Sequence, residues 1–130
     1  MTISSVFQKN TAPVTAATPG TTSNSQTDSG AALDVVTNRN VTGLNISVVY
    51  TGFRALVTVM VDATTDVSES FDLLGTSDGT QWVMSQNSVQ SVNGPANITF
   101  SIDSSGQIKY TTTSTPGFSK RVLRWVIQVI

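Results

Sequence analysis

Apolar and polar side chains alternate with a period of two along most of the chain from Leu33 onward. Such alternation is typical of β-strands with one buried face and one exposed face. Ile98 and Phe100, for example, fall on one face of such a strand, and Thr99 falls on the other. No segment sustains a helical apolar stripe over roughly ten residues. The pattern predicts about eight strands, near residues 33–37, 44–50, 54–62, 67–74, 80–86, 97–103, 107–113 and 121–130.

Turn signals separate these predicted strands, as at Asp78-Gly79, at Gly106 and at Pro116-Gly117. Glycine adopts the positive φ that many tight turns require. Short strands joined by turns, without helices, predict an all-β fold. We expect an antiparallel β-sandwich (jelly-roll or Ig-like) of about eight strands over residues 33–130, with an extended N-terminal arm before it.

Residues 1–32 differ from the rest because they are rich in Thr, Ser, Ala, Pro and Gly and offer almost nothing to bury. A segment of this composition cannot offset the entropy lost when it becomes ordered. It is predicted to be either a flexible tail or linker, or an extended arm that becomes ordered on a neighbouring subunit. In the second case Ile3, Val6 and Phe7 would anchor the arm, as an apolar tip on a polar segment.

The last predicted strand, "RVLRWVIQVI", carries apolar residues on both faces. One face is entirely apolar. The other face is half apolar and comprises Val122, Arg124, Val126, Gln128 and Ile130. A strand with two apolar faces is either central in the fold or covered by a partner. The second face is therefore predicted to belong either to a well-buried last strand or to an oligomer interface.

Composition narrows the possible functions. The chain has 130 residues, a formal net charge of -1 and 12% charged residues, which gives no electrostatic reason to expect a nucleic-acid or membrane partner. It contains no Cys and no His, so it lacks thiolate nucleophiles, the usual zinc ligands and the commonest general base. The N-terminus has no secretory pattern, and we expect a soluble protein made inside a cell.

Acidic residues cluster in the middle of the sequence, at Asp62, Asp66, Glu69, Asp72 and Asp78. Paired carboxylates could act in acid–base catalysis, and carboxylates are also calcium ligands. Their predicted positions at turns favour solvated acids instead, and the sequence has no D-x-D-x-D-G run. We therefore expect no catalytic residue, no metal site and no cofactor, and a protein that is not an enzyme.

The passage "FDLLGTSDGTQWVMSQNSV", residues 71–89, places a tryptophan just after an Asp-Gly turn. An exposed aromatic residue beside a loop can stack on sugars, and Asp78, Gln81 and Trp82 would then form a loop contact with a ligand. Trp82 also alternates with Met84 on one strand face. That position favours packing of Trp82 in the core.

Two longer passages are similar to a known family: "VTVMVDATTDVSESFDLLGTSDGTQWVMSQNSV" and "ITFSIDSSGQIKYTTTSTPGFSKRVLRWVIQVI". A strand leads into a "DGT" turn, and a polar strand follows. A "TFSI-SSGQI-YT" hairpin and an aromatic-containing strand come next. This order resembles a recurring β-domain of tailed-bacteriophage virion proteins, found at the ends of tail fibres and in related head or tail appendages. The resemblance covers residues 54–130.

The resemblance implies a structural or attachment role in the virion, in symmetric homo-oligomers such as a homotrimer, and it brings no catalytic residues. No long shaft repeats precede the domain, which favours a short accessory piece: a capsid decoration protein, a head fibre or a small tail or appendage protein. Its partners would be copies of itself and other virion proteins, such as the major capsid or tail proteins, assembled in the host cytoplasm. The alternative is a carbohydrate- or host-receptor-binding module of a tail fibre.

Overall fold

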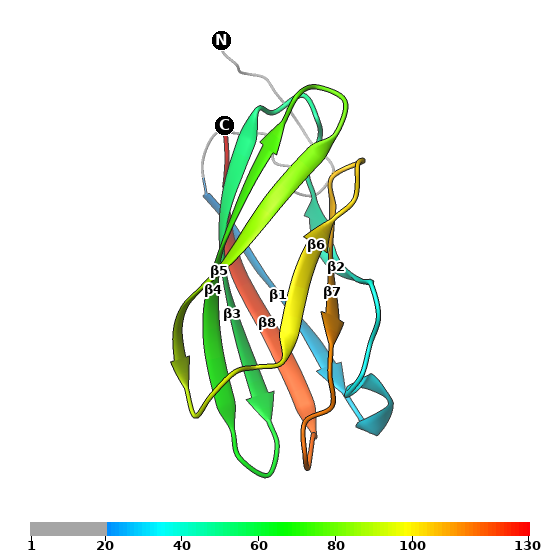
Figure 1. Cartoon of the computed structure of the whole chain (residues 1–130), viewed down its shortest axis with the longest axis vertical. Coiled ribbons are helices and arrows are strands. Elements are labelled where there is room, and N and C mark those ends of the chain that lie inside the picture. Colours follow the sequence, from blue (N-terminus) through cyan, green and yellow to red (C-terminus); the bar gives the residue numbers. More distant parts are fainter. Residues whose placement is uncertain (1–20) are drawn as a thin grey trace.

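In the computed structural model, which describes residues 21–130, the chain folds into two antiparallel β-sheets packed face to face (Figure 1). The strands are β1 (Thr21–Ser29), β2 (Arg39–Asn45), β3 (Gly52–Asp62), β4 (Val67–Ser77), β5 (Trp82–Val92), β6 (Ile98–Ile102), β7 (Gln107–Thr112) and β8 (Lys120–Val129). A short 3-10 helix, η1 (Ala31–Leu33), follows β1. This arrangement confirms the predicted β-sandwich. The predicted arm anchor, Ile3, Val6 and Phe7, lies outside the described residues.

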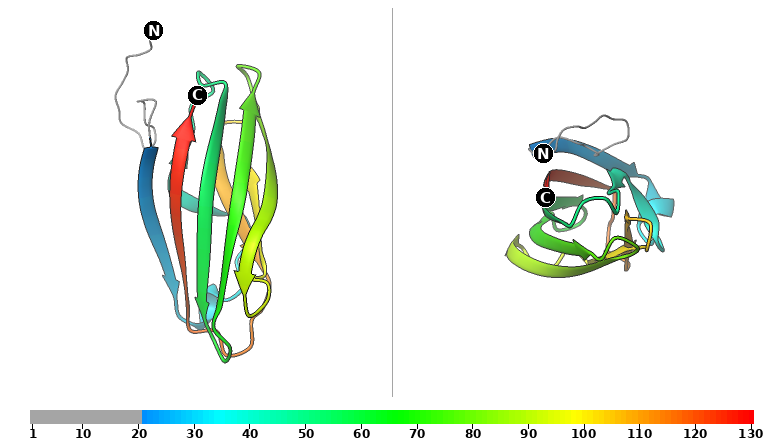
Figure 2. Two further views of the ribbon diagram at one scale, coloured as in Figure 1. Left: turned by 90° about the vertical axis from the view of Figure 1, so that its left-hand side faces the viewer. Right: turned by 90° about the horizontal axis from the view of Figure 1, so that it is seen from above.

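One sheet has five strands in the order β1-β8-β3-β4-β5, and the other has three in the order β2-β7-β6. Neighbouring strands pair antiparallel throughout both sheets. Figure 2 (left) shows the five-stranded sheet face-on, with the smaller sheet behind it. The larger sheet therefore has an inner face, which meets the smaller sheet, and an outer face, which does not.

The core lies between the two inner faces because each strand turns alternate apolar residues inward. The inward apolar side chains of β8, all 5% exposed or less, are Leu123, Trp125, Ile127 and Val129. Across the core, Phe71 of β4 and Phe100 of β6 meet edge to face, with ring centroids 5.6 Å apart. Aromatic pairs in this geometry add to the stabilisation from buried area.

Two predicted strands near the N-terminus differ from the observed elements. Residues 33–37 form no strand; the backbone N–H of Val36 instead donates a hydrogen bond to the Thr112 side chain at 3.0 Å. The Thr112 hydroxyl thus accepts the Val36 N–H, which in a strand would donate to the backbone of a neighbouring strand. The prediction of a strand at 44–50 is also corrected, because β2 ends at Asn45 and a turn follows it.

Strand β1 lies inside the segment that the sequence predicts to be an arm. Its residues, TTSNSQTDS, are all polar, so the apolar alternation that indicates the other strands is missing. It nevertheless pairs with β8 along its whole length, from Thr21 opposite Gln128 to Ser29 opposite Lys120. The five-stranded sheet therefore includes residues on the N-terminal side of the predicted domain boundary at residue 33.

A buried polar cluster attaches β1 to both sheets. Asp28 of β1 and Arg121 of β8 are 0% and 1% exposed, and their side chains pair at 3.2 Å. The hydroxyl of Tyr110, on β7 of the smaller sheet, donates a hydrogen bond to the same Asp28 oxygen, Oδ2. Arg121 also donates to the carbonyl oxygens of Leu33 and Asp34, at 3.0 and 2.8 Å. The cluster therefore joins β1, β8, β7 and the segment after β1.

Two glutamine side chains bridge the open sides of the sandwich. Gln26 of β1 accepts a hydrogen bond from the Thr42 backbone N–H at 2.7 Å and donates one to the Asn40 carbonyl at 3.2 Å. On the opposite side, Gln86 of β5 contacts the backbone of β6 in the same way, accepting at 2.7 Å and donating at 3.3 Å. Each carboxamide thus makes the bonds that the backbone of an added strand would make to the edges of the smaller sheet.

Replacing Asp28 by Ala leaves the Arg121 guanidinium buried without its carboxylate. Removing one member of a buried ion pair costs about 3–5 kcal/mol, so the free energy of unfolding measured in urea should fall by about that amount. Asp62→Ala is the matched control, because the pair between Asp62 and Lys120, at 3.7 Å, is half exposed on both sides and such pairs contribute little. Equal losses in the two variants would contradict a structural role for the cluster.

Tyr110 should make stability depend on alkaline pH. Burial, together with the hydrogen bond to Asp28 and the charge of that residue, raises the pKa of Tyr110 to about 12, whereas an unfolded tyrosine titrates near pH 10. The unfolded state therefore loses the proton first, and the free energy of unfolding should fall by about 2 kcal/mol as the pH rises from about 10 to about 12. Below the unfolded pKa this contribution is fully present.

The control is Tyr110→Phe, which keeps the ring and removes the titrating hydroxyl. Urea denaturation across the same pH range should show that the free energy of unfolding of this variant starts lower and falls less steeply with pH. If the free energy of unfolding falls equally steeply with pH in both proteins, Tyr110 is not the cause of the pH dependence.

Candidate functional site

The outer face of the five-stranded sheet carries the residues that the sequence singled out on β8. Their inward neighbours are buried, and alternation turns Val122, Arg124, Val126, Gln128 and Ile130 away from the core. Val126 is 42% exposed and Ile130 is 75% exposed, whereas Val122 is partly buried. The strand is therefore the buried last strand on one face and an exposed apolar surface on the other.

Other exposed apolar side chains gather on this outer face. The strand register places on it Leu56, Leu74, Val83, Val92, Val126 and Ile130, which are 42–75% exposed. Leu56 of β3 lies directly opposite Val126 of β8. Large exposed apolar patches on a domain mark interaction surfaces. Leu74 and Val83 were not predicted as site residues; their signal is an apolar residue at an outward position of a strand.

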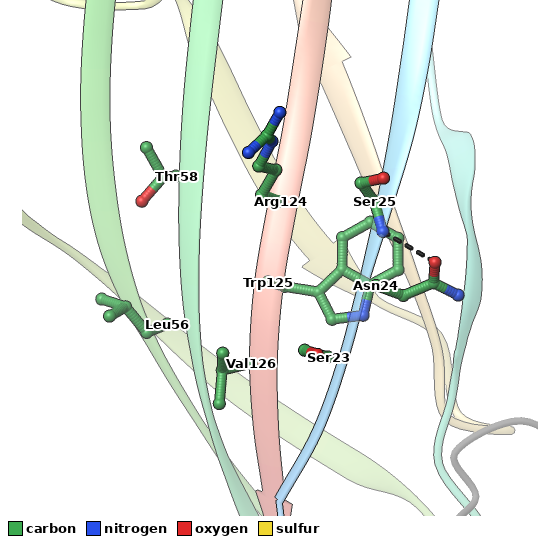
Figure 3. A pocket seen from close by; sticks show the side chains of 8 residues that line it. All are labelled: Ser23, Asn24, Ser25, Leu56, Thr58, Arg124, Trp125 and Val126. Atoms are coloured by element: carbon green, nitrogen blue, oxygen red, sulfur yellow. Dashed lines mark hydrogen bonds between the residues drawn. The ribbon is translucent and has the colours of Figure 1, made fainter.

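Two adjoining depressions hollow this face. One, of about 380 Å³, is drawn in Figure 3 and is lined by Ser23, Asn24, Ser25, Leu56, Thr58, Arg124, Trp125 and Val126. The other, of about 280 Å³, is lined by Arg54, Leu56, Asp72, Val89, Val126 and Gln128. Both include Leu56 and Val126, so the two depressions adjoin, and together we call them the outer trough. Its residues come from all five strands, from β1 at one edge of the sheet to β5 at the other.

The charged groups of the outer trough are unequally paired. Arg54 donates two hydrogen bonds to Asp72, at 3.0 and 2.9 Å, and this contact lowers the pKa of Asp72 and raises that of Arg54. Within residues 21–130, Arg124 takes part in no ion pair. The trough thus combines an apolar floor with one unpaired guanidinium and several hydroxyl groups, a set that can hydrogen-bond to the carbonyl groups of a bound chain.

The predicted loop contact at the turn between β4 and β5 is only partly exposed. Trp82 is 4% exposed; its indole N–H donates to the Ile46 carbonyl at 3.0 Å, and its ring packs 5.3 Å from Phe53. The inclusion of Trp82 in a ligand-contacting loop is therefore wrong, because this residue begins β5 on its inward face. Asp78 and Gln81 are exposed, and a role for them in binding stays a prediction.

Asp78 has a local structural role in that turn. Its carboxylate accepts the backbone N–H groups of Thr80 and Gln81, at 2.9 and 3.0 Å. These bonds lower the pKa of Asp78 and fix an Asx-type turn around Gly79, whose φ is 95°. The acid therefore already has partners that explain its position.

The clustered acids of the sequence are separate in space. Glu69 points inward, where it accepts hydrogen bonds from the Ala96 N–H at 2.8 Å and the Ser88 hydroxyl at 2.5 Å. Asp62 and Asp72 pair with different basic residues. Across residues 21–130, no three or more acidic, histidine or cysteine side chains lie together as metal ligands would. No helix in this part of the chain has the length and hydropathy needed to cross a membrane.

Comparison with known proteins finds similarity only among solved structures. No family model matches the sequence, and no curated protein matches it. The chain is similar over 100% of its length to 25% of a tailspike protein of Acinetobacter phage vB_ApiP_P1, with 18% identity and a TM-score of 0.46. It is similar over 85% of its length to 19% of tailspike protein gp49 of Acinetobacter baumannii bacteriophage Fri1, with 11% identity and a TM-score of 0.46.

One of these comparisons corrects an expectation from sequence. The Fri1 tailspike is described as a capsular polysaccharide depolymerase. Because a structure similar to this chain is an enzyme, the prediction that the chain is not an enzyme is contradicted and is withdrawn. The chain spans about a quarter or less of each tailspike, and at this identity the similarity assigns neither an activity nor a site residue to it.

Proposed function

We propose that the protein is a structural component of a bacteriophage virion and that it assembles with copies of itself through the outer face of its five-stranded sheet. The observation that carries the proposal is the set of exposed apolar side chains on that face, among which Leu56 and Val126 lie directly opposite each other. The resemblance of residues 54–130 to virion β-domains supports the same class of protein.

Burial of this face explains its composition better than exposure to water does. Burying a fully exposed Leu or Val side chain contributes about 1.5–3 kcal/mol, so Leu56 and Val126, which are about half exposed, each gain roughly half of that. The exposed apolar residues extend over several neighbouring strands. Most homo-oligomers have closed symmetry, in which the same contact recurs at every interface. A homotrimer, attached to a capsid or tail protein, is the form that we propose.

The alternative, a carbohydrate- or host-receptor-binding module, would need an exposed aromatic side chain on which a sugar can stack, and neither tryptophan provides one. Trp82 and Trp125 are 4% and 3% exposed, so neither indole presents a face to a sugar. The remaining candidates at the tip, Asp78 and Gln81, have no exposed aromatic partner among the residues described. The structural role is therefore the better supported of the two.

Light scattering of the purified full-length protein tests the assembly. We expect an oligomer whose dissociation constant rises at least about 30-fold in Leu56→Asp and in Val126→Asp, because each places a charge in a buried contact. Val35→Asp is the matched control, since Val35 is 55% exposed and lies between η1 and β2, away from the outer face. A monomeric wild-type protein at micromolar concentration would contradict the proposal.

Mass spectrometry of purified particles tests the location. We expect peptides of this chain in virions of the phage that encodes it, at a ratio to the major capsid or tail protein that reflects a symmetric assembly. Absence of the chain from particles, in a lysate that contains it, would exclude a virion component.

A further inference from the structure

We propose that the outer trough is the binding site for residues 1–20 of a second copy of the chain. The inference rests on the proposed function, because it names what covers the surface that the oligomer buries. It places the apolar tip, Ile3 to Phe7, over Leu56 and Val126 of the neighbouring subunit. The interface then consists of a segment in a groove, in place of two flat sheets packed together.

The shape of the trough favours an extended occupant. Two adjoining hollows of about 380 and 280 Å³ lie on this face. Two such faces packed against each other would fill both hollows only if their outward side chains matched them, because protein interfaces reach the packing density of crystals. A single extended segment can enter a groove and fill it with its side chains. The second copy therefore meets this surface better with its N-terminal segment than with its own sheet.

The polar groups of the trough suit a main chain. A buried extended segment brings carbonyl and N–H groups that need hydrogen-bond partners. The wall formed by β1 offers the hydroxyls of Ser23 and Ser25. The Thr58 hydroxyl on the floor is already hydrogen-bonded to that of Ser70, at 2.9 Å. Arg124 has no ion pair among the described residues and supplies donors for carbonyl oxygens.

The segment has the matching chemistry. Residues 1–20, MTISSVFQKNTAPVTAATPG, include Ile3, Val6 and Phe7 near one end, and Lys9 is their only charged side chain. An occupant with few charges enters an apolar site at little desolvation cost. The polar residues that follow the tip would cross the rim of the trough, where contact with water remains.

The point of attachment gives the segment access. It joins the domain at Thr21, which pairs with Gln128, a residue that lines the trough. Thr21 lies fourteen positions after Phe7 in the sequence, and such a length reaches at most about 50 Å. A five-stranded sheet is only about 24 Å wide, so the segment is long enough to extend past its own sheet to an adjacent subunit.

The distances also favour a neighbour over the segment's own trough. Val126 lies two residues from Gln128 along β8, about 7 Å away. To reach it in the same subunit, the chain between Phe7 and Thr21 would have to loop back on itself, ordering many residues without forming contacts. A neighbouring trough takes up that length as an extended connection.

Cysteine cross-linking in the full-length oligomer tests the inference, because the chain has no natural cysteine. Phe7→Cys and Arg124→Cys are made in separate chains, which are co-expressed and oxidised. Arg124 is exposed and has no ion pair to lose. Its replacement also removes the donors assigned to it above, so the contacts of the tip with Leu56 and Val126 must bring the two thiols together. We expect a covalent heterodimer, identified after trypsin digestion as residues 1–9 joined to residues 122–130. The control pairs Phe7→Cys with Thr113→Cys, on a loop after β7, and should form no such product.

Each outcome separates this inference from the proposed function. A disulfide that forms only within one chain, in a double variant, would overturn binding in trans. No disulfide to residue 124, in an oligomer that Val126→Asp still dissociates, would overturn the inference and leave the symmetric interface standing. A monomeric wild-type protein would overturn both.

Discussion

The buried ion pair between Asp28 and Arg121 is the interaction on which the position of β1, and with it the outer trough, depends. Strand β1 has no apolar side chain to bury, so backbone pairing with β8 and this cluster hold it in the sheet. Tyr110 adds a bond from the smaller sheet, and Arg39 of β2 approaches the other Asp28 oxygen at 3.3 Å. The ion pair of Asp28, on the inward face of β1, therefore helps to hold Ser23 and Ser25, on its outward face, in the wall of the trough.

The edges of the smaller sheet and the outer face of the larger sheet differ in how far they are covered by other groups of the same chain. At Gln26 and Gln86, side-chain amides occupy backbone groups of the smaller sheet that would otherwise be open to a further strand. The outer face of the larger sheet has no comparable protection, and apolar residues occupy several of its outward positions. This contrast locates the surface on which other chains are expected to act.

Much of the fold could be predicted from alternation alone. Strands β3, β4, β6, β7 and β8 lie close to their predicted positions, because their inward residues are apolar and their outward residues mostly polar. Strand β1 could not be found in this way, since its pairing depends on backbone bonds and on Asp28. The segment at 33–37 forms no strand, and side chains of Thr112 and Arg121 take part of its backbone hydrogen bonds.

The site was only partly predictable. The alternation along β8 predicted which of its residues face outward. The core position of Trp82 was predictable because Trp82 and Met84 are two residues apart and therefore share one face of their strand. The outer trough did not, because it depends on which strands become neighbours: Leu56 and Val126 are far apart in sequence and meet only through the pairing of β3 with β8. The contribution of β1 to its wall required a strand that no hydrophobic pattern indicates.

A crystal structure of the full-length oligomer tests most directly whether the outer trough is covered by the chain of a neighbouring subunit. It should show residues 3–7 of one copy in contact with Leu56 and Val126 of the next, repeated around a closed symmetric ring. An oligomer joined through other surfaces, with the outer trough open to solvent in every copy, would contradict the proposed role of this face.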